Sequence, residues 1–228
     1  TGGTFMPNQQ QAHIHMTTFT PDGGYVLATD FSADRILRYE ITGMEEIKYQ
    51  GVAGTVEAGA GPRHIVFSPD SRFFYVISEL SGSINVFSWS YGKSHKVQTI
   101  AADKVGGHGS ADIHISPDGR HLYASNRLKN DGIAIFSINR QTGMLSPVGY
   151  QATSLHPRNF GITPNGNYLL CACRDDNKIQ VFRINKTNGL LEDTHQDITV
   201  DKAVCVKFYP VVMQPGVGNG QFQVIEKP

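Results

Sequence analysis

The 228-residue sequence predicts an all-β fold made of repeated four-stranded antiparallel units. Three observations predict it. The chain holds 24 Gly and 11 Pro with only 18% charged residues, a composition typical of many short strands joined by tight turns. A turn motif recurs at a nearly constant interval, and apolar runs of strand length follow each copy. No segment of useful length shows the 3.6-residue periodicity of an amphipathic helix.

The recurring turn reads Ser/Thr-Pro-Asp/Asn, with Gly next in three of its four full copies, and it follows an apolar strand. In such a turn proline presets φ, the acid or amide side chain closes the turn, and glycine takes a positive φ. Each turn should therefore join the first two strands of a repeat, here called strands A and B, into a hairpin. The turn prolines lie 46 to 48 residues apart, at Pro21, Pro69, Pro117, Pro164 and, in a degenerate fifth copy, Pro210.

Each copy continues in the same way. Strand B is an apolar run (YVLA, FFYVI, HLYA, YLLC), and strand C follows it (ILRY, INVF, IAIF, IQVF). A turn, glycine-containing at 142–145 and 188–191, leads to a weaker fourth strand. Four strands in a period of about 47 residues predict the blades of a β-propeller. We expect a single domain over residues 1–228, with blades at about 13–60, 61–109, 110–156 and 157–203, then a closing strand and tail at 204–228.

Four blades are fewer than the six to eight common in closed propellers, although four-bladed rings exist. An open end would expose an apolar blade face and an unpaired strand edge. Either the ring closes with four blades, or a missing N-terminal piece or a second copy completes it.

Charge and cysteine content restrict the compartment and the partners. Lys+Arg and Asp+Glu each number 20, so no overall field should attract nucleic acid or a membrane surface. The three cysteines form no disulfide framework and no zinc-site spacing, and we interpret them as small buried apolar residues. Together these features favour a cytoplasmic protein without a bound metal or cofactor.

The repeat also indicates which residues reach one end of every blade. Because strands A and B are antiparallel, the start of A and the end of B lie at the same end, near the central axis. These two registers and their neighbours place titratable side chains at that rim: His15, Arg63, Arg158, Glu79, Arg127 and Arg174, with His64, Asp112, Asn159 and His114 beside them. A single Arg or Glu at a strand end is ordinarily just solvated. A cluster rich in arginine in a neutral protein instead predicts a site for a carboxylate or phosphate group.

Four stretches carry a resemblance to a known family: GPRHIVFSPD at 61–70, EL at 79–80, ADIHISPDGRHLYA at 111–124 and PRNF at 157–160. They resemble the seven-bladed β-propeller lactonases, with branches that are 6-phosphogluconolactonase-like and carboxy-muconate lactonizing enzyme-like. The resemblance runs from about residue 13 to 211 and implies that about four of seven blades are present, the C-terminal ones. The catalytic set of the lactonizing branch falls here on His15, Arg63, Glu79 and Arg158.

The resemblance implies metal-independent hydrolysis of a small anionic sugar-acid lactone, 6-phosphogluconolactone in particular. Glu79 or His15 would activate water, and Arg63 and Arg158 would hold the oxyanion or the anionic group. Arg127 would contact phosphate, and His64, Asp112, His114, Asn159 and Arg174 would help to bind substrate. Two alternatives stay open: cycloisomerisation of a muconate-type diacid, and a non-catalytic propeller that binds an anionic ligand or a protein partner.

Overall fold

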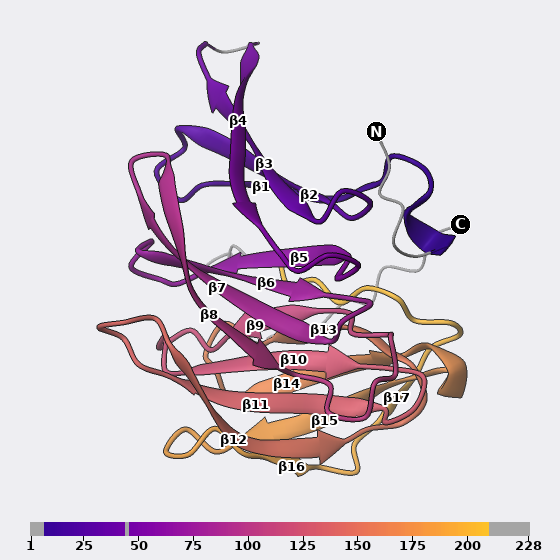
Figure 1. The fold of residues 1–228 in the computed structure, drawn as a ribbon. Helices are drawn as coiled ribbons and strands as arrows, with labels where there is room; N and C mark the ends of the chain where they lie inside the picture. The colour runs from indigo at the N-terminus through magenta and orange to yellow at the C-terminus, as the bar shows by residue number, and fades with distance from the viewer. Residues whose placement is uncertain (1–6, 44–45, 210–228) are drawn as a thin grey trace.

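The computed structural model describes residues 7–43 and 46–209, and almost all regular structure in them is β. Four antiparallel sheets follow one another along the chain, each built from consecutive strands (Figure 1). The first two sheets contain β1 (Ile14–Phe19), β2 (Tyr25–Asp30), β3 (Arg35–Ile41) and β4 (Ile47–Thr55), then β5 (Pro62–Phe67), β6 (Phe73–Ser78), β7 (Ser83–Ser90) and β8 (Lys93–Ala101).

The third sheet is shorter at its first strand, and the fourth ends in two small strands. They contain β9 (Ile113–Ile115), β10 (His121–Asn126), β11 (Gly132–Ile138) and β12 (Leu145–Ala152), then β13 (Pro157–Ile162), β14 (Tyr168–Cys173), β15 (Lys178–Ile184), β16 (Leu191–Asp193) and β17 (Ile198–Thr199). Two 3-10 turns complete the described elements, η1 (Pro7–Gln9) and η2 (Arg174–Asp176). No helix in the described ranges is long and apolar enough to cross a bilayer.

The predicted A–B turns are confirmed in all four sheets. In each turn the Ser or Thr hydroxyl donates to the Asp or Asn side chain two residues later, at 2.5 to 2.8 Å. The same hydroxyl accepts the backbone N–H that opens strand B, at 3.0 Å. The residue after the Asp or Asn has positive φ in every copy, including Ser71 at 61° where the other three have glycine. Local sequence alone therefore determines these hairpins.

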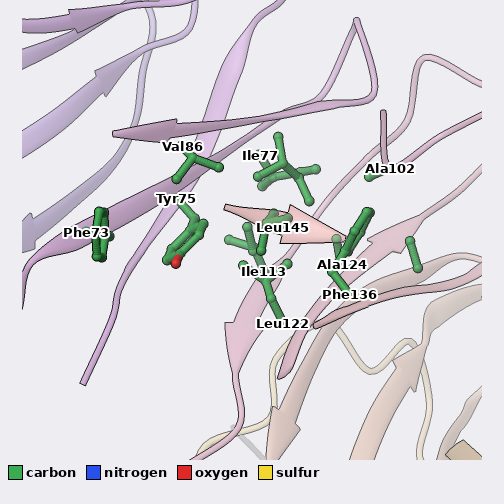
Figure 2. Close-up of a cluster of buried hydrophobic side chains, with 12 residues drawn as sticks. Phe73, Tyr75, Ile77, Val86, Ala102, Ile113, Leu122, Ala124, Phe136 and Leu145 are labelled. Carbon is green, nitrogen blue, oxygen red and sulfur yellow. The ribbon is translucent and has the colours of Figure 1, made fainter. Parts of the chain in front are cut away.

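The sheets pack face to face, and the core consists of the layers between them. Figure 2 shows the layer between the second and third sheets, where Tyr75 and Val86 meet Ile113 and Leu122. All six residues of β6 and of β10 are buried, because another sheet covers each side of them. Equivalent clusters fill the interfaces between the first and second sheets and between the third and fourth.

A repeated tyrosine contact ties neighbouring sheets together. The Tyr75 hydroxyl donates to the carbonyl of Gly143 at 3.0 Å, and the Tyr123 hydroxyl donates to that of Gly189 at 2.8 Å. In both cases a strand-B tyrosine reaches the turn before the fourth strand of the next sheet. Burial raises the pKa of both hydroxyls, which therefore remain protonated donors.

The described sheets form an arc with consecutive contacts. β1 contacts β5, β5 contacts β9 and β10 contacts β13, while the first and fourth sheets share no comparable interface within the described residues. The first sheet accordingly leaves Phe19, Ile47 and Tyr49 more than half exposed. The four described blades thus do not close into a ring through strand contacts of their own.

The expected closing strand is not a strand where the structure describes it. Residues 203–209 have no ladder hydrogen bonds and run beside β13, where the Val206 N–H donates to the Asn159 side chain at 2.7 Å. A strand A needs a strand B beside it, and the described residues provide none for this segment. Pro210 and the rest of the expected tail lie outside the described residues.

The cysteine prediction was correct for two residues and wrong for the third. Cys171 and Cys173 are fully buried and unbridged, with their Sγ atoms 3.9 Å apart. Cys205 is exposed, because it lies in the irregular 203–209 segment rather than in a sheet.

Candidate functional site

A cavity of about 450 Å³ opens at the end of the sheets where strands A begin. Its wall combines residues from β1, β5, β13, the start of the third sheet and the 203–209 segment. The chemically active side chains in that wall are His15, Arg63, His64, Asp112, His114, Arg158, Asn159, Cys205 and Lys207. Seven of these were predicted from the repeat register, so strand periodicity located most of the cavity.

A β-bulge marks the position of three of these residues. The A–B register shifts between Ile14 and Met16, between Pro62 and His64, and between Pro157 and Asn159. The extra residue in the three sheets is His15, Arg63 and Arg158 respectively. A bulge leaves one residue out of the ladder and re-aims its side chain, which accounts for three functional groups on one wall.

Glu79 lies behind the cavity wall between two guanidinium groups. Arg63 Nε is 2.7 Å from Glu79 Oε2, and Arg127 Nη2 is 3.2 Å from Glu79 Oε1. Arg63 is only 3% exposed, and its Nη1 also donates to the Ala111 carbonyl. Burial lowers the pKa of Arg63 to about 10 although Glu79 opposes the shift, so the guanidinium remains charged at neutral pH.

Asp112 is the most heavily hydrogen-bonded side chain of the site. It is 3% exposed and accepts from His64 Nδ1 at 2.7 Å and His114 Nε2 at 3.1 Å. The Asn159 amide and the backbone N–H groups of Ile113 and Phe160 also donate to it. Burial alone would raise the pKa of Asp112, but its electrostatic interaction and hydrogen bonds with His114 and His64 hold that pKa well below its usual range. Asp112 is therefore an ionised carboxylate at neutral pH.

His15 has a different environment from His64. Its ring lies 5.2 Å from that of His64, centroid to centroid, and its buried Nδ1 has no hydrogen-bond partner among the described residues. Burial, followed by the charges of Arg63, His64, His13 and Arg158, lowers the pKa of His15 to about 3. The imidazole is thus neutral at physiological pH and is a weak base.

Two further predicted residues, Arg127 and Arg174, lie outside the cavity wall, as Glu79 does. Arg127 is buried and donates to the Gly109 carbonyl at 2.7 Å and to His156 Nε2 at 3.1 Å, besides its ion pair with Glu79. Arg174 begins η2 and pairs with Asp175 at 2.7 Å. The register placed both at the correct end of their strands, but it could not show which way each side chain turns.

Lys207 and Cys205 are the two chemically active cavity residues that the sequence did not predict, and Lys207 is the charged one. It is exposed, and it reaches the wall from a segment that the turn register does not cover. Neither Lys207 nor Arg158 forms an ion pair within the part of the chain that the structure describes. A hydrophilic lysine after the last repeat carries no sequence signal of such a role. The cavity therefore offers two cations to an anionic ligand.

Within residues 7–43 and 46–209, no three His, Cys, Asp or Glu side chains are grouped so that they could hold a metal ion. The polar groups that meet the cavity are thus cationic, imidazole and amide groups around one buried carboxylate. Such a set can bind an anion, stabilise a developing negative charge and accept a proton from water.

A model of the family described as "Lactonase, 7-bladed beta-propeller" matches residues 2–208. The chain belongs to the seven-bladed β-propeller lactonase family. This finding confirms the family resemblance carried by the four sequence stretches between residues 61 and 160. It also gives the four sheets a context, since this lactonase family builds propellers of seven blades.

Several lactonase relatives are similar over most of this chain. A 6-phosphogluconolactonase of Formosa agariphila is 36% identical over 214 residues, covering 91% of this chain and 61% of the relative. The crystal structure of a putative 6-phosphogluconolactonase from Bacteroides uniformis is 56% identical with a TM-score of 0.87, covering 91% of this chain and 62% of its own. A periplasmic gluconolactonase from Pseudomonas aeruginosa is 29% identical with a TM-score of 0.83, covering 88% and 58%. The chain thus spans about three fifths of the length of these lactonases.

Proposed function

We propose that the protein containing this chain hydrolyses a sugar-acid lactone, with 6-phosphogluconolactone as substrate and 6-phosphogluconate as product. The observation that carries the proposal is the cavity itself, in which Arg63, Arg158 and Lys207 present positive charge beside the His64 and His15 imidazoles. Relatives described as 6-phosphogluconolactonases, similar over about nine tenths of this chain, support the same substrate.

Lactone hydrolysis requires stabilisation of the oxyanion that forms when water attacks the ring carbonyl. Arg63 is suited to this task because its ion pair with Glu79 and its hydrogen bond to the Ala111 carbonyl fix the buried guanidinium before substrate binds. Arg158, aimed by its bulge, would bind the same oxygen or the anionic group of the substrate. Preorganised charge of this kind lowers the barrier because little reorganisation is needed in the transition state.

The phosphate contact is assigned differently from the sequence-based expectation. Arg127 has donors committed to Glu79, Gly109 and His156, whereas Lys207 and Arg158 meet the cavity without an ion-pair partner among the described residues. We therefore place the substrate phosphate on Lys207 and Arg158. The Lys207→Ala variant should raise KM for the phosphorylated lactone more than for the unphosphorylated one.

The deciding experiment compares three substrates on the full-length protein: 6-phosphogluconolactone, unphosphorylated gluconolactone and a muconate-type diacid. We expect hydrolysis of both lactones, with the higher kcat/KM for the phosphorylated one. Cyclisation of the diacid without lactone hydrolysis would establish the cycloisomerase alternative. No turnover together with tight binding of an anionic sugar acid would favour the non-catalytic alternative. Because Arg63 and Arg158 already supply positive charge, turnover should persist after dialysis against EDTA.

Completion of the ring is part of the same proposal. The exposed apolar side chains Phe19, Ile47 and Tyr49 of the first sheet would be covered by further blades or by a second copy. Sedimentation of residues 1–228 alone should therefore show self-association, and a compact monomer would contradict the second-copy arrangement. The unbridged buried cysteines support a cytoplasmic location, and the balanced charge supports the absence of nucleic-acid and membrane partners.

A further inference from the structure

The protonation state of His64 follows from its two ring contacts. Arg63 Nη1 lies 3.3 Å from His64 Nε2, and a guanidinium can only donate, so Nε2 is the accepting nitrogen. His64 Nδ1 lies 2.7 Å from the ionised Asp112 and must be the donor there. Both contacts assign the same neutral tautomer, with the proton on Nδ1 and the lone pair on Nε2. Arg63 Nη1 also donates to the Ala111 carbonyl, so its longer contact to Nε2 is the weaker of the two.

The other candidate bases lack these features. Both oxygens of Glu79 are engaged by Arg63 and Arg127, and Glu79 is absent from the cavity wall. Among the described residues His15 has no carboxylate partner, and a pKa of about 3 makes it a weak base. For His64, burial lowers the pKa while Asp112 opposes the shift, so the ring is neutral at rest and has a carboxylate to stabilise the imidazolium. His114 also touches Asp112, but through Nε2 and at 3.1 Å.

We propose that His64 is the general base of the cavity and that Asp112 is the residue that positions it, an assignment that rests on the lactonase function proposed above. His64 Nε2 takes a proton from water as the water oxygen bonds to the lactone carbonyl carbon. The carbonyl electron pair moves onto oxygen beside Arg63. When the tetrahedral intermediate collapses, the ring C–O bond breaks, and the leaving oxygen takes the proton back from Nε2. Protons and electrons balance, and the sugar acid is released.

The geometry supports this sequence of events because the base and the oxyanion donor are adjacent. His64 and Arg63 are consecutive residues on β5, and the bulge at Arg63 lets both side chains contribute to the same wall. Asp112 comes from the next sheet, so the orientation of the base depends on the packing between the second and third sheets. A fixed carboxylate behind an imidazole holds the tautomer and stabilises the charged form that proton transfer creates.

The test is the pH dependence of lactone hydrolysis by the full-length protein and its variants. The wild-type kcat/KM should fall on acidification as His64 is protonated, while His15 stays neutral down to about pH 3. His64→Gln should lower kcat on the order of 100-fold and remove the acid limb of the pH profile, which is the fall in kcat/KM at low pH. Asp112→Asn should lower kcat similarly with little change in KM and move the limb to lower pH, because the carboxylate that raises the His64 pKa is gone. The titratable and charged groups that line the cavity together with His64 are His15, Arg63, Asp112, His114, Arg158, Cys205 and Lys207.

Asp118→Asn is the matched control. Asp118 lies in the far-end turn of the same sheet as Asp112, and the fourth sheet has Asn165 at the equivalent position. The Asp118→Asn variant should keep the wild-type kcat/KM at neutral pH and the wild-type fall in kcat/KM at acidic pH. An acid limb that survives in His64→Gln, or that stays in place in Asp112→Asn, would overturn the assignment. A limb lost in His114→Asn but kept in His64→Gln would transfer the role to His114.

A second measurement does not depend on activity. Imidazole ¹⁵N NMR of the wild-type protein should show His64 with a protonated Nδ1 and an unprotonated Nε2, the signal being identified by its loss in His64→Gln. The opposite tautomer would contradict the Asp112 pairing. If the wild-type protein hydrolyses no lactone, the proposed function fails along with the catalytic role of His64. If the wild-type protein hydrolyses the lactone and His64→Gln does so at the same rate, only the role of His64 as general base is refuted.

Discussion

Arg63 and Glu79 form an ion pair, Nε to Oε2 2.7 Å, at the base of the cavity wall, and the Arg63 side chain is almost completely buried. The same carboxylate pairs with Arg127 through its other oxygen, so two buried positive charges share one negative charge. From Arg127 the contacts continue to His156, whose Nδ1 meets Asp175 at 3.2 Å. The cavity wall is thus supported by a chain of polar contacts that crosses three sheets.

Removing the charge of Glu79 should therefore destabilise the protein. In Glu79→Gln, Arg63 and Arg127 would lose their shared counter-ion, and we expect a loss of about 2 kcal/mol in the free energy of unfolding by urea. The control is Asp197→Asn, which breaks the exposed pair with Lys178 and should cost less than about 1 kcal/mol. Equal losses in the two variants would mean that the Glu79 contacts are not a structural support.

Arg158 should matter for turnover and little for folding. It lies on the cavity wall and has no ion-pair partner in the described ranges, so Arg158→Ala should lower kcat/KM on the order of 100-fold. Its urea midpoint should stay close to that of the wild type. Arg183→Ala, an exposed arginine on β15 of the same sheet, provides the comparison and should change neither quantity. Near-normal lactone turnover by Arg158→Ala would exclude Arg158 from the site.

His15 should make stability depend on pH over a defined range. Its pKa is 6.5 when unfolded and about 3 when folded, so between these values the unfolded chain binds the additional proton. Stability must then fall as the pH drops from about 6.5 towards 3. His15→Gln should lose less stability than the wild type between pH 7 and pH 4, measured by urea unfolding. His195→Gln, which alters an exposed side chain, should follow the wild-type curve. Parallel curves for His15→Gln and the wild type would contradict this burial of His15.

Gly189 should be required by the packing between the third and fourth sheets. It has φ +77°, and a Cβ there would lie 2.4 Å from Cδ2 of His121. Gly189→Ala adds this overlap to the strain of a positive φ, and we expect a loss of about 2 to 3 kcal/mol by thermal or urea unfolding. Gly23→Ala has φ +70° with no neighbour within 4 Å, so it should show the backbone strain alone, about 1 kcal/mol. Similar losses in both would show that the His121 contact is readily relieved.

Local sequence explains why so much of the fold could be predicted. The hydroxyl, proline and acid or amide of each A–B turn interact within a few residues, as the Ser116–Asp118 hydrogen bond shows, so their spacing identifies every A–B hairpin in the described residues. The apolar runs FFYVI and HLYA likewise predict strands that neighbouring sheets cover on both faces. The same logic failed at 203–209, because the described residues offer that segment no strand partner.

The sequence by itself determined the repeat, the four sheets, the family and the end of the blades at which His15, Arg63 and Arg158 gather. These properties follow from short-range turn chemistry and from the two-residue period of a strand, which any copy of the repeat reveals. Only the tertiary structure decided that Arg174 turns to Asp175, that Glu79 pairs with the buried Arg127, and that Lys207 meets the cavity. It also decided that Asp112 binds both His64 and His114. Side-chain direction and ion pairing depend on contacts between sheets, and those contacts exist only when the blades are packed.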